Sequence, residues 1–378
     1  MTPLRVLVAG GGVAALEAVL ALRGLGRDHL AVELLAPSGE FVDRPSSVQA
    51  PFGGAPPPRV PLDGLGATLH RGALGAVDLA RSEAVTTDGG RLPYDRLIVA
   101  VGARPVEGVP GAILFRGPAS AGAVEGALAG ASERVLFTLP AGAGWTLPLY
   151  ELALLAAHEH PGGPEFVVVT PERRPLEIFG PAASDALARL LDRAGVRFIG
   201  ESVAEHVLGG SLATADGRLL SADAVVALPR ARGPFVAGLP SDEDGFLEVD
   251  EHCRVVDGVY AAGDATASPL KQGGLATQQA DAAAEAIAAE AGAPVVPRRV
   301  RRVLRGIVLT GEAPLFLRRD LDEDAAVART LRGAPPGVSR AQLWWPSGKL
   351  AGRYITGFLA DRGSETLSDR PHRRPLPH

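Results

Sequence analysis

Cysteine and lysine are both scarce in this chain of 378 residues. The single cysteine, Cys253, excludes an intrachain disulfide, a CxxC redox pair and a cluster of thiolate metal ligands. No apolar run approaches the roughly 18–20 residues of a membrane span, and no basic, apolar leader precedes the first predicted strand. The net charge of −5 does not indicate nucleic-acid binding. We therefore expect a cytoplasmic protein with no metal site, no nucleic-acid partner and no transmembrane segment.

The chain is longer than one hydrophobic core usually supports, so two or three domains are expected. Hydrophobic residues make up 46% of the chain and charged residues 21%, which is typical of a globular protein. Composition therefore indicates a globular protein of more than one domain, and its function must be read from the motifs.

A glycine-rich turn follows the first predicted strand. Leu4–Ala9 has the continuous apolar pattern of a buried parallel strand, and a helix is predicted from about Val13 to Leu25. The turn between them has the pattern GxGxxA. Gly10 permits a tight turn, Gly12 lets the backbone approach a pyrophosphate, and Ala15 lets helix and strand pack closely. This order favours dinucleotide binding over an ordinary glycine-rich turn.

The end of the second predicted strand, Ala31–Ala36, lacks the acid that usually binds the ribose hydroxyls. Ala36 takes that position, and Glu33 lies inside the strand. Ser38 or backbone groups could substitute. We expect the adenosine end of a dinucleotide to be held in an unusual way.

One of the chain's two lysines follows a second glycine turn. The predicted strand Val259–Ala262 runs into Gly263 and Asp264, and Lys271 comes just before an alanine-rich helix. Helix N-termini favour negative charge, so an ammonium group there suits an anionic or electron-accepting ligand. The alternative is a solvated lysine before an ordinary helix.

Three separated motifs agree in order and spacing. They are the GxGxxA region at residues 6–17, the segment Tyr94–Pro105 (YDRLIVAVGARP), and Gly245–Ala280 with its GFLEVD, VYAAGD and KQGG sequences. Together they resemble the pyridine nucleotide–disulfide oxidoreductase superfamily, flavoproteins with two dinucleotide-binding domains. The KQGG segment and the glutamine pair after it are most similar to the sulfide:quinone reductase and type II NADH dehydrogenase branch. The resemblance covers about residues 1–300 and implies non-covalent FAD.

The resemblance also implies an α/β fold with two Rossmann-like dinucleotide-binding domains, the second inserted into the first, and a small α+β domain at the C-terminus. The FAD-binding domain would comprise residues 1–105 and 233–297, the atypical NAD(P)-binding-like domain residues 106–232, and a capping or interface domain residues 298–378. In the resembling branch such a terminal unit covers the flavin, forms a homodimer or touches a membrane surface, and all three remain open. Within it we expect strands at 307–310 and 314–317, an aromatic segment at 343–345, a helix at 350–359 and a disordered tail from 363 to 378.

By the same resemblance, the FAD site combines all three motifs. Asp264 would accept hydrogen bonds from ribityl or pyrophosphate-linked hydroxyls, and Arg44, in the loop 41–48, would lie near the isoalloxazine. Lys271 is the one candidate for a catalytic role, through its positive charge beside the reduced flavin. The predicted cofactor-binding residues are Gly10, Gly12, Val13, Ala14, Ala15, Arg44, Ala100, Val101, Gly102, Gly263, Asp264, Lys271, Gln272 and Gly273.

The middle segment departs from the family pattern. After the predicted strand 134–139, Trp145 follows the glycine pair, and Pro148 falls at the start of the next helix. A bulky side chain and a missing N–H both hinder pyrophosphate binding, although Glu172 and the arginines after it could still meet a phosphate. We expect the fold to be kept and the usual NAD(P)H site to be altered. Trp145, Pro148 and Tyr150 are either the wall of a substrate pocket or packing between domains.

The leading hypothesis is an oxidoreductase that passes electrons from an unidentified donor through FAD to an acceptor such as a quinone. Cys253, in the predicted strand 252–256, is interpreted as a buried structural residue, which removes a disulfide reductase or a sulfur relay through two cysteines. An NAD(P)H dehydrogenase with an altered nucleotide loop stays open. So does a flavin-bearing electron-transfer or sensing subunit that serves a protein partner.

Overall fold

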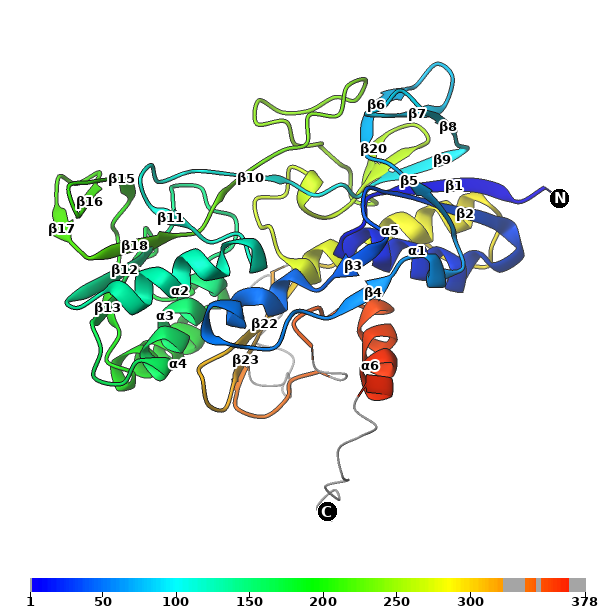
Figure 1. Cartoon of the computed structure of the whole chain (residues 1–378). Coiled ribbons are helices and arrows are strands. Elements are labelled where there is room, and N and C mark those ends of the chain that lie inside the picture. The colour runs from blue at the N-terminus through cyan, green and yellow to red at the C-terminus, as the bar shows by residue number, and fades with distance from the viewer. Residues whose placement is uncertain (1, 322–336, 345–347, 367–378) are drawn as a thin grey trace, which may run out of the picture.

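The computed structural model describes residues 2–321, 337–344 and 348–366, with side chains up to residue 362 in the last helix. Figure 1 shows two lobes, with the C-terminal elements below and between them. None of the described helices is long and apolar enough to cross a membrane.

The first lobe is built on a six-stranded sheet with the order β20-β21-β9-β1-β2-β5. All neighbouring strands are parallel except β20 and β21. In chain order the strands are β1 (Leu4–Ala9), β2 (Leu30–Ala36), β5 (Thr68–Arg71), β9 (Arg96–Val99), β20 (Arg254–Val256) and β21 (Val259–Ala261). Segments about 160 residues apart in the chain therefore form one sheet.

Helices cover one face of this sheet and a small second sheet lies over the other (Figure 1). The helices are α1 (Val13–Gly26) and α5 (Gly273–Glu290). The small antiparallel sheet consists of β6 (Leu74–Asp78), β7 (Glu83–Thr86) and β8 (Arg91–Pro93). The sequence predicted β1 and the start of α1 at the residues where the structure has them.

The second lobe repeats this layering around a five-stranded parallel sheet with the order β11-β18-β12-β13-β14. Its strands are β11 (Ile113–Leu114), β12 (Arg134–Thr138), β13 (Glu165–Val169), β14 (Arg197–Ile199) and β18 (Ala224–Ala227). One face shares a core with α2 (Ala121–Gly130), α3 (Leu147–Glu159) and α4 (Pro181–Arg193). The other face packs against β15 (Ala204–Leu208), β16 (Ser211–Thr214) and β17 (Leu219–Ser221). The predicted α/β fold with two Rossmann-like units is confirmed.

Two antiparallel strands connect the lobes, β10 (Arg104–Val106) and β19 (Arg230–Arg232). Between β2 and β5 the chain forms the strand pair β3 (Glu40–Val42) and β4 (Arg59–Pro61), with the 3-10 helix η2 (Arg44–Phe52) between them. Figure 1 shows η2 reaching from the first lobe toward the second.

The C-terminal elements correct several predicted boundaries. The sheet comprises β22 (Val303–Val308), β23 (Leu315–Asp320) and β24 (Val338–Ser339), so the predicted strand at 307–310 was placed too late and that at 314–317 was too short. Arg305 and Gly306 hide the start of β22, because they interrupt its apolar pattern. The last helix, α6 (Ile355–Thr366), begins five residues later than predicted and includes the start of the predicted disordered tail. Trp345 and residues 367–378 lie outside the described residues.

Two buried carboxylates hold the C-terminal elements in place. Glu17, on α1, accepts hydrogen bonds from the N–H groups of Tyr354 (2.9 Å) and Ile355 (2.6 Å), which explains where α6 begins. Glu151, on α3, pairs with Lys349 at 2.6 Å and accepts from the N–H of Leu309 at 3.0 Å. Each lobe therefore contributes one carboxylate to the docking of the C-terminal segment.

Cys253 lies just before β20 rather than inside a strand, which corrects the predicted strand at 252–256. Its backbone has φ of +67°, and its side chain is fully buried. Burial raises the pKa of the thiol to about 12. The thiol is therefore protonated and inert at neutral pH.

Candidate functional site

The turn after β1 lies directly against the end of β9. Gly10 has φ of +137°, and a Cβ at this position would lie 2.1 Å from the carbonyl oxygen of Ala100. The N–H of Ala100 in turn donates to the carbonyl of Ala9 at 2.7 Å. Only glycine fits this close approach, so the first and second motifs are brought together at the carboxyl edge of the sheet.

The N-terminus of α1 is open. Gly12 is the N-cap residue, no side chain caps the helix, and the first turn contains no acidic residue. No described atom lies within 4 Å of a Cβ built on Gly12. The free N–H groups and the positive end of the helix dipole therefore face a space that an anion could enter. The pyrophosphate of a dinucleotide fits this combination of open backbone and unpaired donors.

The third motif contacts the first at Gly263. A Cβ on Gly263 would lie 3.0 Å from Cβ of Ala14 and 3.4 Å from Cβ of Ala276, so the turn after β21 is wedged between α1 and α5. The N–H of Gly263 donates to Oε1 of Gln279 at 2.8 Å. Residues from all three motifs therefore surround the edge of the sheet where β1, β9 and β21 end.

Charged side chains gather beside this turn. Burial raises the pKa of Asp264, while the nearby charges of Lys271 and Arg44 lower it. Two cations and one carboxylate, from three separate parts of the sequence, are thus close enough to act on one another.

Lys271 is not a solvated surface residue. Its Nζ donates to the carbonyl oxygens of Thr266 (2.6 Å) and Asp264 (3.2 Å), and it lies 3.6 Å from the centre of the Phe246 ring. Burial lowers the pKa of Lys271 to about 8, against the opposing effect of Asp264 and Asp242. The ammonium group is held inside its own loop, where the carbonyls and the ring face partly balance its charge.

The start of α5 differs from the start of α1. The side chain of Gln272 caps the helix by accepting from the N–H of Leu275 at 2.8 Å, and its amide donates to the carbonyl of Arg305 at 3.0 Å. A Cβ on Gly273 would lie 2.8 Å from Leu350 and 3.9 Å from Pro45. The helix predicted after Lys271 is present, but part of its N-terminus is already occupied.

Neither side chain considered for the adenosine ribose is free of partners. Glu33 points along the sheet to His70, with 2.6 Å between Oε2 and Nε2. The hydroxyl of Ser38 accepts from the N–H of Glu40 at 3.1 Å, which leaves its own proton to donate. Ala36 is fully buried at the end of β2.

In the second lobe, the corresponding turn is filled by side chains. Pro148 lies in the first turn of α3, a position that suits a proline but leaves one N–H fewer for an anion. The ring of Trp145 packs edge-on against Phe179, with 5.8 Å between centroids. Tyr150 is fully buried. It therefore does not line a surface pocket, and for this residue the packing alternative is the one that the structure shows.

Glu172, the acid that follows β13, already has hydrogen-bond partners. Glu172 accepts hydrogen bonds from the hydroxyls of Tyr150 (2.5 Å) and of Thr146 (3.1 Å), the N-cap residue of α3. Burial raises the pKa of Glu172, and these two hydroxyls lower it. Arg174 pairs with Asp185. A carboxylate of the protein itself thus lies at the helix start where a phosphate would bind.

The two turns are in direct contact. The N–H of Lys271 donates to the carbonyl of Gly144 at 3.1 Å, and a Cβ on Gly144 would lie 2.7 Å from Cγ of Lys271. The altered turn of the second lobe therefore supports the loop that holds Lys271.

Sequence reasoning missed Asp43 and Lys349. Asp43 precedes η2, its Oδ1 is buried without a hydrogen-bond partner among the described residues, and burial raises its pKa while Lys349 lowers it. Lys349 also pairs with Glu151, so the second lysine of the chain joins both lobes. Because lysine is scarce, Lys349 was as conspicuous in the sequence as Lys271, but only Lys271 was predicted to have a role.

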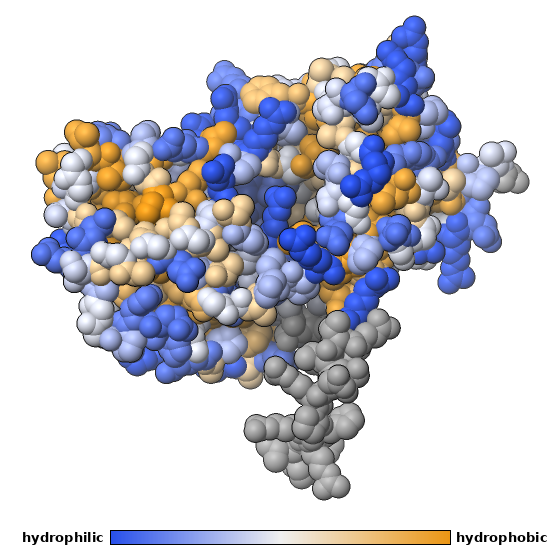
Figure 2. Space-filling model, in the orientation of Figure 1, coloured by the Kyte–Doolittle hydropathy of each residue, from blue (hydrophilic) through white to orange (hydrophobic). Residues whose placement is uncertain are grey.

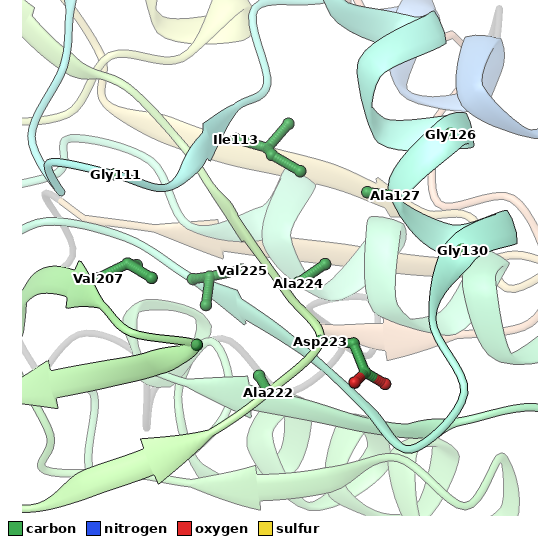
Figure 3. Close-up of a pocket in the computed structure, with 11 residues that line it drawn as sticks. Gly111, Ile113, Gly126, Ala127, Gly130, Val207, Ala222, Asp223, Ala224 and Val225 are labelled. Carbon is green, nitrogen blue, oxygen red and sulfur yellow. The ribbon is translucent and has the colours of Figure 1, made fainter.

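Two cavities open elsewhere in the described structure, and neither is lined by the candidate residues. Figure 3 shows the first, of about 450 Å³, between α2, β11, β18 and the β15–β16 turn. Its one carboxylate, Asp223, already accepts from the N–H groups of Ser132, Glu133 and Arg134. Leu208 and Leu219, on the small sheet of the same lobe, are about three-quarters exposed, and Figure 2 shows hydrophobic surface over this lobe.

Comparison with known proteins gives one family match and many matches to solved structures. A family model described as pyridine nucleotide-disulphide oxidoreductase matches residues 4–288. No curated protein matches the chain.

Three solved structures illustrate the structural likeness. The sulfide:quinone oxidoreductase of Aquifex aeolicus superposes with a TM-score of 0.74 at 18% identity, covering 84% of this chain and 83% of that one. A ferredoxin reductase from Rhodopseudomonas palustris gives 0.65 at 20%, covering 82% and 81%. An NAD-dependent persulfide reductase from A. fulgidus gives 0.60 at 19%, covering 82% and 63%. At these identities the likeness shows the fold alone.

Proposed function

Since the chain belongs to the pyridine nucleotide-disulphide oxidoreductase family and is an oxidoreductase, we propose that it binds FAD without a covalent bond and takes electrons from a donor other than NAD(P)H. The acceptor we propose is a quinone or a similar small molecule. The observation that carries the proposal is the contrast between the open space beside Gly12, before α1, and the side chains that occupy the turn before α3.

The residues around α1 would hold the cofactor. Gly10 and Gly12 would let the pyrophosphate approach the backbone, and the unpaired N–H groups of the first turn of α1 would bind it. Ala15 packs α1 onto the sheet, and the turns at Ala100–Gly102 and Gly263 would border the cofactor on either side. When bound, FAD would supply the reversible electron transfer that no side chain offers.

The charged residues would tune the site. Arg44 and Lys271 place two positive charges near Asp264. Lys271 is held by carbonyl groups of its own loop, so we propose that it acts through its electrostatic field rather than by transferring a proton. Asp264, close to both cations, would accept from hydroxyl groups of the cofactor.

The second lobe argues against a tightly bound nicotinamide dinucleotide. Glu172 lies where the phosphate or the ribose would be recognised, and its carboxylate is already used by Tyr150 and Thr146. Pro148 removes one N–H donor from the first turn of α3. We therefore favour a reductase with another electron donor over an NAD(P)H dehydrogenase.

We also propose the domain division 1–105 and 233–297 for FAD, 106–232 for the altered nucleotide unit, and 298–378 for the terminal unit. It is supported by the composition of the sheets, since β1, β2, β5, β9, β20 and β21 share one sheet. The strands between β10 and β19 belong to other sheets.

Anaerobic titration of the purified protein tests the proposal. We expect a yellow protein, or a colourless one that becomes yellow with added FAD. Micromolar NADH or NADPH should not reduce it, and a quinone should reoxidise the chemically reduced flavin. Sulfide is the third donor to compare, since the single cysteine provides no pair for a sulfur relay. A protein that fails to take up FAD would refute the cofactor assignment, and rapid saturable reduction by NADH would refute the donor assignment alone.

A further inference from the structure

The second cavity lies between α5 and the sheet β22–β23 and has a volume of about 560 Å³, a size typical of small-molecule sites. One wall is the outer face of α5, with Thr277, Asp281 and Glu285 one helical turn apart. Six arginines line the rest: Arg298, Arg299, Arg301, Arg305, Arg318 and Arg353.

Four of these arginines have carboxylate partners. Arg298 and Arg353 both pair with Glu285. Arg299 pairs with Glu251 and Arg301 with Asp320. Three carboxylates thus serve four guanidinium groups, because Arg298 and Arg353 share Glu285.

The remaining two face each other without such a partner. Arg305 on β22 and Arg318 on β23 are directly opposite in the antiparallel pair. Within the described part of the chain, neither guanidinium group has a hydrogen bond or an ion pair. Burial, together with the charges of Arg318 and Arg301, lowers the pKa of Arg305, and Asp320, which already pairs with Arg301, opposes this effect. Like charges at directly opposite positions destabilise a strand pair, so an unbalanced arginine pair requires an explanation.

Two further polar atoms in this cavity lack partners among the described residues. They are Nε1 of Trp344, a donor, and Oδ1 of Asp281. Burial and the neighbouring Glu17 raise the pKa of Asp281 to about 8, against the effect of Arg353. Burial and Glu17 therefore weaken Asp281 as a counter-ion for the arginines. A buried N–H without an acceptor costs free energy, as does an unpaired buried cation.

We propose that this cavity binds the oxyanion group of a small molecule, a phosphoryl or carboxylate group, between Arg305, Arg318 and Trp344. An oxyanion offers several acceptor oxygens, which suit two planar guanidinium groups and one indole N–H. The site is separate from the β1–α1 turn, because it lies between α5 and the C-terminal sheet, on the flank of α5 rather than at its N-terminus.

Calorimetry on the full chain with its FAD tests the site, with phosphate, malonate and chloride at equal ionic strength. We expect phosphate or malonate to bind and chloride not to bind. Arg305→Met removes one charge-assisted hydrogen-bonding group and should weaken binding at least about tenfold. Arg189→Met, which removes an exposed arginine on α4, is the matched control and should leave binding unchanged.

The thermal midpoint of unfolding, measured without added anion, gives a second readout, in which the same substitution should stabilise the protein. Arg305→Met should raise it, because the opposed charges are gone. Arg318→Met should behave in the same way, and it replaces Arg305→Met if that variant does not fold. Binding of phosphate alone would identify a phosphoryl ligand, and binding of malonate alone a carboxylate ligand. Equal effects of chloride and the oxyanions, or oxyanion binding that survives both substitutions, would overturn the proposal.

Discussion

The two lobes have the same three layers but opposite helix starts. In the first lobe the chain enters α1 through Gly12, with no side-chain cap and with open space beside the backbone. In the second lobe it enters α3 through Thr146, which does not cap the helix either but whose hydroxyl donates to Glu172. The parallel sheet and its covering layers are retained in both. If the proposed function is correct, a few residues at one helix start remove an anion site without changing the architecture around it.

The largest expected effect is on dinucleotide binding by the second lobe. Losing two hydrogen bonds to a charged ligand, each worth about 1.5–3 kcal/mol, should weaken NADH binding by roughly 10²–10⁴-fold. We expect stopped-flow reduction of bound FAD by NADH or NADPH to be slow and to rise linearly with concentration, without saturation. Saturation at micromolar NADH would remove the proposed difference between the lobes, as would a co-crystal with the dinucleotide across Gly142–Trp145.

The next effect should appear in the first lobe alone. Gly12→Val places a side chain in the open space beside α1, where no described atom lies within 4 Å, so the apoprotein should fold normally. FAD affinity should fall at least about 100-fold, since the pyrophosphate can no longer reach the backbone. Gly142→Ala in the turn of the second lobe is the control; it introduces some strain at a φ of +72° but should leave FAD affinity unchanged. Equal FAD affinity in both variants would contradict the assignment of the site to α1.

A smaller effect is expected from the lysine at which the two turns meet. Lys271→Met removes one partly compensated charge, worth about 1–2 kcal/mol, and should lower the midpoint potential of bound FAD by roughly 20–45 mV. Because the pKa of Lys271 is lowered to about 8, the ammonium is charged below that pH and neutral above it. The difference between the parent and the variant should therefore shrink as the pH rises through 8. Arg193→Met, an exposed change on α4, should leave the potential unchanged.

The smallest effect concerns a tyrosine–glutamate pair in each lobe. Tyr150→Phe leaves the buried carboxylate of Glu172 without its shortest hydrogen bond, so it should cost about 1–2 kcal/mol and lower the thermal midpoint. Tyr260→Phe should cost less, because Glu290 keeps its ion pairs with Arg96 and Arg254. Differential scanning calorimetry measures both variants. A larger loss for Tyr260→Phe would show that Glu172 is not held as described.

The local parts of the fold could be predicted from the sequence, and the contacts between distant segments could not. β1, the start of α1 and the helix after Lys271 follow from apolar runs and glycine turns that are readable within a short window. By contrast, the pair of Glu151 with Lys349 spans 198 residues, and nothing near either residue indicates the other.

In the candidate site, too, local features could be predicted from the sequence and contacts between distant side chains could not. The resemblance implied that the motifs of Gly10 and Ala100 belong to one cofactor site, but not that these residues touch. The hydrogen bond of Tyr150 to Glu172 depends on side-chain packing across β13 and α3. Trp145 and Pro148 did mark the altered turn, because both residue types conflict locally with phosphate binding. The hydrogen bond between Glu172 and Thr146 at the start of α3 could be seen only in three dimensions.

The carboxylate of Glu17 has a consequence for how this protein is made. It is fully buried on the first helix of the chain, and the two N–H groups that it accepts belong to residues 337 and 338 positions further on. At about 5–20 residues per second, a ribosome needs roughly 20–70 s to add that length of chain. Throughout that interval α1 carries a carboxylate that must stay hydrated or protonated, so the amino-terminal lobe cannot close its core during synthesis. A segment made more than 330 residues after Glu17 thus completes the unit to which Glu17 belongs.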